Sequence, residues 1–339
     1  MKRASLVALA LAATSVTLAG ARPAGDSPVS LVFAAISAPA RVSYTGTVEA
    51  KRVENRGVET AVYRVEHRAP DLTCRNYFAP AALSGDSVVS EGARTLSVDP
   101  RRHDVVETSD ATGDAAALNA DSTLLRDNYR INVTRSETFD GRAAIDLELI
   151  NKYSGRATML LRLDRATRIV LDRQEFDSTG ALVSEIRFEQ IRYAASIPSA
   201  DFAVPAGYAR VRETSVAQSL GDAGDAIQRA GFAARAPRSL PGGFSAIEGT
   251  VVNVRGIRTL HLLYSDGLRT VSLFETSVAT RLDATALQPQ MLRIGTENAE
   301  YVVDGSTALL AWSDGGLHYT LAGELGLVDF THLAESLQR

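Results

Sequence analysis

The sequence has little of what supports metal, redox or cofactor chemistry. Its 339 residues include one cysteine, Cys74, which excludes an internal disulfide and a cysteine-based zinc site. The five histidines are scattered along the chain, and none belongs to a His-Glu-x-x-His pair. We also find no Gly-x-Ser-x-Gly elbow, phosphate-binding glycine loop or dinucleotide fingerprint. The sequence therefore predicts no metal, no cofactor and no catalytic residues, and it favours a binding protein over an enzyme.

Clusters of positive charge are absent as well. Basic residues number 36 against 40 acidic ones, for a net charge of −4, and the two signs are interleaved along the chain. No basic run is longer than Arg101-Arg102. Because non-specific nucleic-acid binding needs a basic domain or stripe to neutralise phosphates, we expect no nucleic-acid partner.

Long apolar runs are missing apart from residues 4–19. Lys2 and Arg3 precede this run, and Ala19-Gly20-Ala21 follows it as a small-residue cleavage site. This pattern predicts a signal peptide over residues 1–21 that is removed on export. An uncleaved membrane anchor is the alternative, but the run is shorter than the roughly 20 apolar residues that span a bilayer.

The rest of the chain reads mainly as antiparallel β-strands. Apolar and polar residues alternate over 44–53, 58–67, 95–98 and 103–107, and a regular meander with turn residues follows over 129–193. Residues 28–38 predict a short helix before the strands, and residues 111–127 predict a helix-compatible insertion. We therefore expect an α+β, mainly antiparallel fold: one curved, half-open sheet or barrel covered by short helices, and a smaller sheet with a terminal helix.

One face of the meander is apolar and must be covered. The N-terminal segment, the 111–127 insertion or a ligand could cover it. If a ligand does, these side chains line its cavity; if helices do, they form a dry core, and the sequence does not separate the two. The residues concerned are Ile145, Leu147, Leu149, Met159, Leu161, Leu163, Ile186 and Phe188.

The chain divides into two strand-rich parts. Residues 209–239 are rich in Ala, Arg, Gly and Ser and predict a linker, with one helical turn around 225–229. We thus expect an N-terminal domain over 22–208 and a C-terminal domain over 240–339. The second domain shows further hairpins and ends in a helix, for which Asp329 is the predicted N-cap. Its single tryptophan, Trp312, fits either the core or an interface anchor.

The first part of the chain holds several short motifs: Tyr-Thr-Gly-Thr at 44–47, Asn-Tyr at 128–129 with Asp-Gly-Arg-Ala-Ala at 140–144, and Arg-Leu-Asp with a threonine at 162–167. These motifs resemble those of the MucB/RseB family of periplasmic sigma-E regulators. Residues 44–47 resemble that family's Tyr-x-Gly-Thr, and residues 128–129 and 140–144 resemble its central strand entry and turn. Residues 162–167 resemble its strand ending in Leu-Asp-x-x-Thr. Residues 71–90, in contrast, look unlike the family's usual strand.

The second part carries the most specific motif of the resemblance, the Tyr-Ser-Asp-Gly-Leu hairpin at 264–268. Residues 240–244 resemble Leu-Pro-x-Gly-Phe, and residues 323–325 before 333–337 resemble the closing Gly-Glu and helix. The family's proline after that Gly-Glu is absent, because Leu325-Gly326-Leu327 stands there.

The resemblance implies a fold, a place and a function. It implies a LolA-like N-terminal domain and a periplasmic protein that binds the periplasmic part of a membrane anti-sigma factor. Such a protein shields the anti-sigma factor from proteolysis and senses lipid, lipopolysaccharide or the acyl chain of a mislocalised lipoprotein. We expect Tyr264, Asp266 and Trp312 at the partner interface. The alternative is a periplasmic lipid or lipoprotein carrier of the LolA type.

Overall fold

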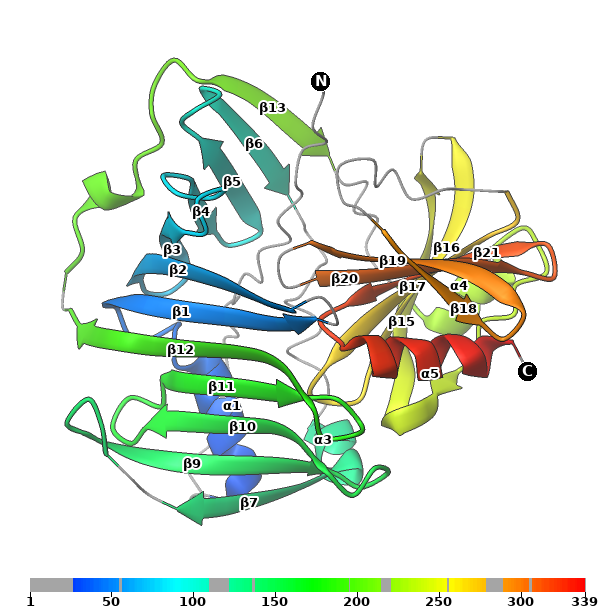
Figure 1. Cartoon of the computed structure of the whole chain (residues 1–339), viewed down its shortest axis with the longest axis horizontal. Helices are drawn as coiled ribbons and strands as arrows, with labels where there is room; N and C mark the ends of the chain where they lie inside the picture. The colour runs from blue at the N-terminus through cyan, green and yellow to red at the C-terminus, as the bar shows by residue number, and fades with distance from the viewer. Residues whose placement is uncertain are drawn as a thin grey trace.

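Two β-sheets lie side by side in the computed structural model (Figure 1). The structure describes residues 27–54, 57–109, 122–135, 138–194, 196–214, 221–254, 256–278, 289–304 and 307–338. Within these ranges a large curved, open sheet is followed by a smaller sheet and a terminal helix, so the predicted fold class is confirmed. The predicted signal peptide and most of the 111–127 insertion lie outside the described residues.

The larger sheet has 13 strands, and all of its pairs are antiparallel except β13 with β6. The two-residue strand β8 (Thr138–Phe139) pairs only with β9. In hydrogen-bonding order the other strands are β13 (Ala209–Thr214), β6 (Asp104–Ser109), β5 (Arg94–Asp99), β4 (Ser87–Glu91), β3 (Leu72–Ala79), β2 (Gly57–Arg68), β1 (Tyr44–Glu54), β12 (Leu182–Tyr193), β11 (Val170–Phe176), β10 (Ala157–Asp164), β9 (Arg142–Asn151) and β7 (Tyr129–Arg135).

The smaller sheet has eight strands, all paired antiparallel. In order they are β14 (Ser239–Leu240), β15 (Phe244–Val254), β16 (Ile257–Ser265), β17 (Thr270–Thr276), β21 (Leu317–Gly323), β20 (Thr307–Asp314), β19 (Glu297–Asp304) and β18 (Gln290–Ile294). The described helices are α1 (Pro28–Ser37), α3 (Ser122–Asn128), α4 (Ala223–Gln228), α5 (Leu327–Leu337) and the 3-10 turns η1 (Ser199–Phe202) and η2 (Pro241–Gly243).

Helix α1 covers part of the larger sheet. It starts where the Ser27 hydroxyl accepts a hydrogen bond from the Ser30 amide, with Pro28 in the first turn, as is typical of a helix N-terminus. Leu31, Val32 and Ala35 are its buried residues, and they pack with side chains of α3, β7, β9 and β10. The short helix predicted near residue 28 is therefore confirmed.

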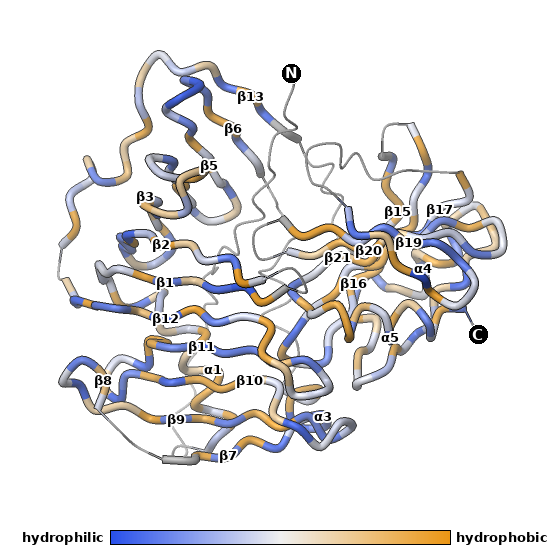
Figure 2. The backbone as a smooth tube through the Cα atoms, in the orientation of Figure 1, coloured by the Kyte–Doolittle hydropathy of each residue, from blue (hydrophilic) through white to orange (hydrophobic). Residues whose placement is uncertain are grey.

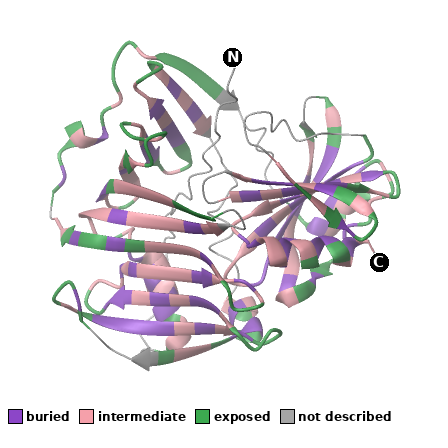
Figure 3. Cartoon of the chain, viewed as in Figure 1, coloured by how far each residue is buried: buried purple, intermediate pink, exposed green. Residues whose placement is uncertain are grey.

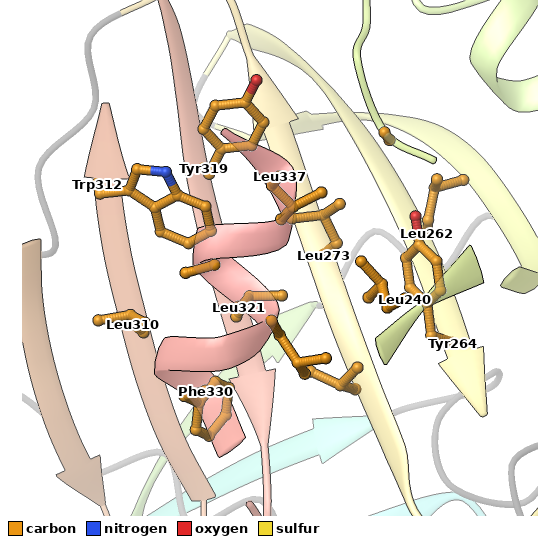
Figure 4. Packing of buried hydrophobic residues seen from close by; sticks show 14 of the residues in the cluster. Leu240, Leu262, Tyr264, Leu273, Leu310, Trp312, Tyr319, Leu321, Phe330 and Leu337 are labelled. Carbon is orange, nitrogen blue, oxygen red and sulfur yellow. The ribbon is translucent and has the colours of Figure 1, made fainter. Parts of the chain in front are cut away.

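The smaller sheet packs its own apolar core against α5 and α4 (Figure 4). The helical spacing predicted for the chain end is confirmed, because Phe330, Leu333, Ala334 and Leu337 are all buried. The predicted N-cap is wrong. Gly326 occupies that position, and Asp329 lies in the first turn, where its carboxylate bonds to groups outside the helix.

The predicted linker, residues 209–239, contains regular structure within its described part. Residues 209–214 form β13, which pairs in parallel with β6 at the edge of the larger sheet. Helix α4 follows at 223–228, close to the predicted helical turn, and its Ala226 is buried in the core of the smaller sheet. The described side chains of β13, residues 209–212, are all exposed, so this strand lacks the buried apolar face by which a strand is predicted.

Candidate functional site

A cavity of about 160 Å³ lies against the larger sheet, over strands β1, β2, β3, β4 and β12. The strand register explains which side chains reach it. His67 pairs with Tyr44 on one side and with Thr73 on the other, and Val65 pairs with Gly46 and with Arg75. Successive side chains of a strand point to opposite faces, so these alternate residues share one face.

The cavity has an apolar part and a polar part. Val48, Val65, Ile186 and Phe188 contribute the apolar wall, together with Pro39. Two tyrosines and five polar residues complete the lining: Tyr44, Tyr63, His67, Asp71, Thr73, Arg75 and Ser90. Such a mixture of apolar surface with a few polar groups is typical of small-molecule sites.

His67 is held as a neutral, fixed side chain at this site. Its ring stacks on Tyr44 with centroids 4.9 Å apart. Its Nε2 lies 2.7 Å from the Pro39 carbonyl oxygen and its Nδ1 lies 2.8 Å from the Thr73 hydroxyl. Because a carbonyl only accepts, Nε2 carries the proton and Nδ1 accepts from Thr73. Burial lowers the pKa of His67, so the ring stays uncharged at neutral pH.

Three tyrosines surround the one arginine of the cavity. The rings of Tyr63 and Tyr77 lie 5.2 Å apart, and the Arg75 guanidinium carbon lies 6.0 Å from the Tyr63 ring centre. Burial raises the pKa of Tyr44 to about 12 and also raises the pKa of Tyr63. These phenols therefore keep their protons and can donate hydrogen bonds.

Gly46 leaves room for an aromatic ring at the cavity wall. A Cβ at this position would lie 2.5 Å from the Gln190 carbonyl oxygen and 2.8 Å from two ring carbons of Phe188. Any larger side chain would displace that ring. The Tyr-x-Gly-Thr motif thus has a packing role: its glycine admits Phe188 and its Tyr44 stacks on His67.

The predicted cavity residues divide into two groups. Ile186 and Phe188 line the cavity. The other six are buried, each no more than 9% exposed, and they pack in one cluster with α1, α3 and β7: Ile145, Leu147, Leu149, Met159, Leu161 and Leu163. Figure 3 shows β9 as largely buried, and Figure 2 shows apolar residues along it. The sequence did not decide what covers these six residues, and in this structure helices α1 and α3 pack against them.

The two sheets meet at a buried polar group, which we name the Asp266 cluster: Asn128, Tyr129, Asp266, Arg269 and Asp329. Asp266 is 0% exposed, and its Oδ2 accepts from the Tyr129 hydroxyl at 2.6 Å and from Arg269 Nε at 2.9 Å. Its Oδ1 accepts from the amides of Leu268 and Arg269. A buried carboxylate with four donors has its hydrogen-bonding capacity filled.

Arg269 and Asn128 extend the Asp266 cluster across the contact. Arg269 donates to Asp329 Oδ2 at 3.1 Å, and Asp329 Oδ1 accepts from the Ser178 amide of the larger sheet at 3.0 Å. Asn128 donates to the carbonyl oxygens of Gly243 and Asp266, each at 2.9 Å. Burial acts to lower the pKa of Arg269, but Tyr129 and the two carboxylates outweigh it and raise it.

Gly267 brings the 264–268 hairpin close to helix α3. Its φ is +93°, and a Cβ there would lie 2.3 Å from the Leu125 amide nitrogen. Both the backbone conformation and the close approach require glycine. The most specific motif of the sequence therefore forms a contact inside the chain.

A second line of contacts joins the sheets at residues 324–325. Arg52 of β1 donates to the Leu325 carbonyl oxygen at 3.0 Å, and Arg173 of β11 pairs with Glu324 at 3.0 Å. Arg52 is only 6% exposed. Strand β1 thus contributes both to the cavity wall and to the contact with the smaller sheet.

The predicted partner residues are buried within the chain. Tyr264 is 0% exposed and donates to the Pro237 carbonyl oxygen at 2.6 Å. Trp312 is 4% exposed and stacks on Tyr319, with centroids 5.0 Å apart (Figure 4). Asp266 lies in the contact between the sheets. None of the three presents a free surface to another protein in this conformation.

The sequence missed the polar half of the cavity. Thr73, Arg75 and Ser90 lie on β3 and β4, in the stretch 71–90 for which it predicted no strand. Polar and apolar residues mix on both faces of β3, so the alternation that identifies a half-buried strand is absent. The signal that the sequence did offer is Arg75 and Tyr77, two residues apart and therefore on one face of a strand.

Neither a metal site nor a spanning helix is found in the part of the chain described. No group of three or more His, Cys, Asp or Glu side chains there is placed to hold a metal ion. No helix there is long and apolar enough to cross a bilayer.

Comparisons with known proteins bear on the fold. No protein family matches the sequence, and no curated protein is significantly similar to it. The Pseudomonas aeruginosa MucA/MucB complex matches with 18% identity and a TM-score of 0.57, over 91% of this chain and 96% of that chain. MucB in complex with MucA(peri) matches with 18% identity and a TM-score of 0.56, over 91% and 97%. A LolA superfamily protein from Nitrosomonas europaea covers 53% of this chain and 99% of its own, at 13% identity and a TM-score of 0.28. The chain therefore has a MucB-like fold.

Proposed function

We propose that this chain is a MucB-like regulator that binds the periplasmic part of a membrane anti-sigma factor. The supporting observation is that the likeness to MucB covers 91% of this chain and includes both sheets. Both of those matched structures are complexes with MucA. In this proposal the predicted signal peptide exports the chain to the periplasm, where it shields its partner from proteolysis without any enzymatic step.

The proposal includes a ligand-sensing role for the larger sheet. In this proposal the chain has an N-terminal domain over 22–208 and a C-terminal domain over 240–339, although β13 (209–214) pairs in the larger sheet and α4 packs on the smaller one. A lipid or lipoprotein acyl chain would enter at the cavity and contact Tyr44 and Val48 of β1. The same strand carries Arg52, which bonds to Leu325 of the smaller sheet. In this proposal, a ligand that displaces β1 at the cavity would also alter the Arg52 contact with the smaller sheet.

Binding to the anti-sigma segment tests the proposal. The chain without residues 1–21 is titrated with the periplasmic segment of the anti-sigma factor encoded near its gene, and heat of binding is measured. We expect a one-to-one complex and slower proteolysis of the segment when the chain is present. An unrelated exported segment of the same length and net charge is the control. Absence of binding, or equal binding to both segments, would contradict the proposal.

A lipid or lipoprotein carrier is the second candidate, and the cavity on the larger sheet favours it. Transfer of a fluorescent lipid from donor to acceptor vesicles by the full chain separates the two functions. A carrier accelerates this transfer at catalytic amounts of protein. A regulator binds its partner and leaves the transfer rate unchanged.

A further inference from the structure

Strand β13 is attached to the larger sheet mainly through its main chain. It pairs with β6 in the one parallel ladder described for that sheet, and Figure 1 shows it at the rim. A parallel ladder is slightly less stable per residue than an antiparallel one. The side chains of residues 209–212 are all exposed, so they bury little apolar surface. The hold of β13 on the sheet is therefore weaker than that of the inner strands.

The chain is anchored on both sides of β13. Before it, Phe202 is buried in a core formed with β3, β4, β5 and β6, and the Tyr208 ring lies 5.2 Å from the His103 ring. After it, Gly221 pairs with Gly249 of β15. Because both anchors lie outside the strand, β13 can leave β6 by local opening while the two sheets stay folded.

The ion pair between Arg212 and Glu107 does not fix β13 in place either. The Arg212 side chain is 70% exposed, and exposed ion pairs contribute little to stability. Glu107 also accepts from Arg94 Nε at 3.1 Å, within the sheet. When β13 leaves, this carboxylate, which is 8% exposed, keeps Arg94 as its partner. No buried charge is then left unpaired, so the usual penalty for breaking a buried ion pair does not arise.

The edge of β6 beneath β13 has the features of a strand-addition site. The main-chain groups of an uncovered edge strand can pair with an extended segment of another chain. Strand β13 shows which side chains fit there, since Val211 lies opposite Val106 and Arg212 lies opposite Glu107. The carboxylate of Glu107 complements a basic residue on whatever strand takes this place.

We propose that β13 is an exchangeable strand, and that the β6 edge it covers binds an extended segment of a partner protein. The segment adds parallel to β6, with a basic residue opposite Glu107 and an apolar residue opposite Val106. Strand β13 is then an internal competitor that blocks the site until a partner displaces it. This site goes beyond the proposed regulatory function, because it needs neither an anti-sigma factor nor a ligand in the cavity.

The exchange has a consequence for the whole chain. After β13 the chain leads to α4, which packs on the smaller sheet. A partner that takes the place of β13 therefore also frees the segment that joins the two sheets.

Hydrogen exchange tests whether β13 detaches. In the chain without residues 1–21, the β13 amides should exchange by local opening, faster than those of β10. Arg212→Glu places two carboxylates opposite each other and should speed β13 exchange about fivefold. Arg210→Glu is the matched control, because it makes the same charge change opposite Val105. Equal exchange of β13 and β10, or equal effects of the two substitutions, would contradict the detachment.

A labelled peptide with the sequence of residues 208–214 tests the docking site. Its binding is measured by fluorescence anisotropy, to the unmodified chain and to a variant with Gly-Ser repeats in place of residues 209–214. We expect at least about tenfold tighter binding to the variant, because a tethered strand competes at high effective concentration. Trp312 fluorescence shows that the smaller sheet of the variant is folded. Equal binding to both chains, or to neither, would overturn the proposal.

Two altered peptides test the charge at the site. The peptide with Arg212→Glu should bind the variant about fivefold more weakly than the peptide with Arg210→Glu, because only the first places its carboxylate opposite Glu107. Equal binding of the two peptides would contradict the role of Glu107.

Sedimentation of the unmodified chain distinguishes a partner protein from a second copy. We expect a monomer, with its β6 edge covered by its own β13. A dimer that the peptide dissociates would show that copies of this chain exchange β13 with each other, and it would overturn the assignment to a different protein.

Discussion

At the scale of single residues, the chain depends on charges that it buries. Asp266 and Arg269 are enclosed between the two sheets, where each of them makes several charged hydrogen bonds. Removing one partner of a buried charged group leaves the other without compensation, which is more costly than losing an exposed ion pair. Among polar side chains, the strongest effects of mutation should therefore come from residues that contact Asp266.

Tyr129→Phe removes one hydroxyl and keeps the ring. Its hydroxyl donates to Asp266 at 2.6 Å in a buried site. We expect the free energy of unfolding to fall by about 1.5–3 kcal/mol, the usual worth of a hydrogen bond to a charged group. Urea unfolding measures this. Tyr153→Phe, at a ring that is 66% exposed, is the control and should change stability by less than about 0.5 kcal/mol. Equal effects of the two substitutions would contradict the assigned bond.

Cys74 predicts a pH dependence of chemical reactivity. Its side chain is 3% exposed, and burial raises its pKa to about 11. The folded thiol should therefore resist thiol reagents at about pH 8, where an unfolded one reacts as the thiolate. As pH rises above about 9, the unfolded chain loses this proton first, so this thiol lowers stability there.

The rate of Cys74 labelling by a disulfide reagent, with and without urea, checks this expectation. Cys74 is the only thiol in the chain, so the signal is unambiguous. Labelling should follow global unfolding. Rapid labelling of the native chain at neutral pH would show that the thiol is accessible.

At the scale of elements, helix α1 decides which part of the larger sheet remains open. Six of the predicted cavity residues are packed beneath α1 and α3, and a cavity lies over β1, β2, β3, β4 and β12. In this structure the apolar faces of β9 and β10 pack against these two helices. Periodicity predicted the apolar face of each strand, because that depends on the strand alone. It did not predict the covering element, which depends on how distant segments meet.

Leu31→Ala tests whether α1 is firmly packed. Leu31 is 3% exposed in the cluster with β9 and β10. Truncating it leaves a cavity, and we expect a loss of about 2–5 kcal/mol in unfolding free energy. Val133→Ala, at an apolar side chain that is 49% exposed on β7, is the control and should lose far less. Similar small losses in both would mean that α1 does not cover the sheet.

The strands β3 and β4 show the limit of prediction at this scale. Their side chains mix polar and apolar residues on each face, because one face lines a cavity with polar groups and the other holds Cys74 in a small core. A functional surface breaks the alternation on which strand prediction relies. Strands β9 and β10, in contrast, have a buried apolar face and lie within the meander predicted over 129–193.

At the scale of the whole molecule, the Asp266 cluster and the contacts at 324–325 join the two sheets. The 264–268 motif was the most specific in the sequence, and it was expected at a surface for another protein. It lies instead inside the chain, where Gly267 approaches α3 and Asp266 accepts from Tyr129. Sequence alone could identify the motif, but only the relative placement of the sheets shows what it contacts.

Asn128→Ala should weaken this contact from the side of the larger sheet. Its amide donates to carbonyl oxygens of Gly243 and Asp266, and losing it leaves both without that donor. Trp312, the only tryptophan, lies in the core of the smaller sheet and reports its unfolding by fluorescence. We expect its urea midpoint to fall, because the free energy of unfolding decreases by about 1–3 kcal/mol.

The control for Asn128→Ala is Asn132→Ala on the same side of the contact. Asn132 bonds to Glu148 within the larger sheet at 3.4 Å. Its removal should leave the Trp312 midpoint unchanged. An unchanged midpoint in Asn128→Ala as well would mean that the two sheets are not energetically coupled.

Native mass spectrometry with the anti-sigma segment tests the proposed function most directly. The chain without residues 1–21 is mixed at micromolar concentration with the periplasmic segment of the anti-sigma factor encoded near its gene, and the masses are recorded. We predict a dominant species with the summed mass of one chain and one segment. When a labelled segment is used, an excess of the unlabelled segment should displace it from this species. Spectra that contain only the separate chain and segment would contradict the regulatory function.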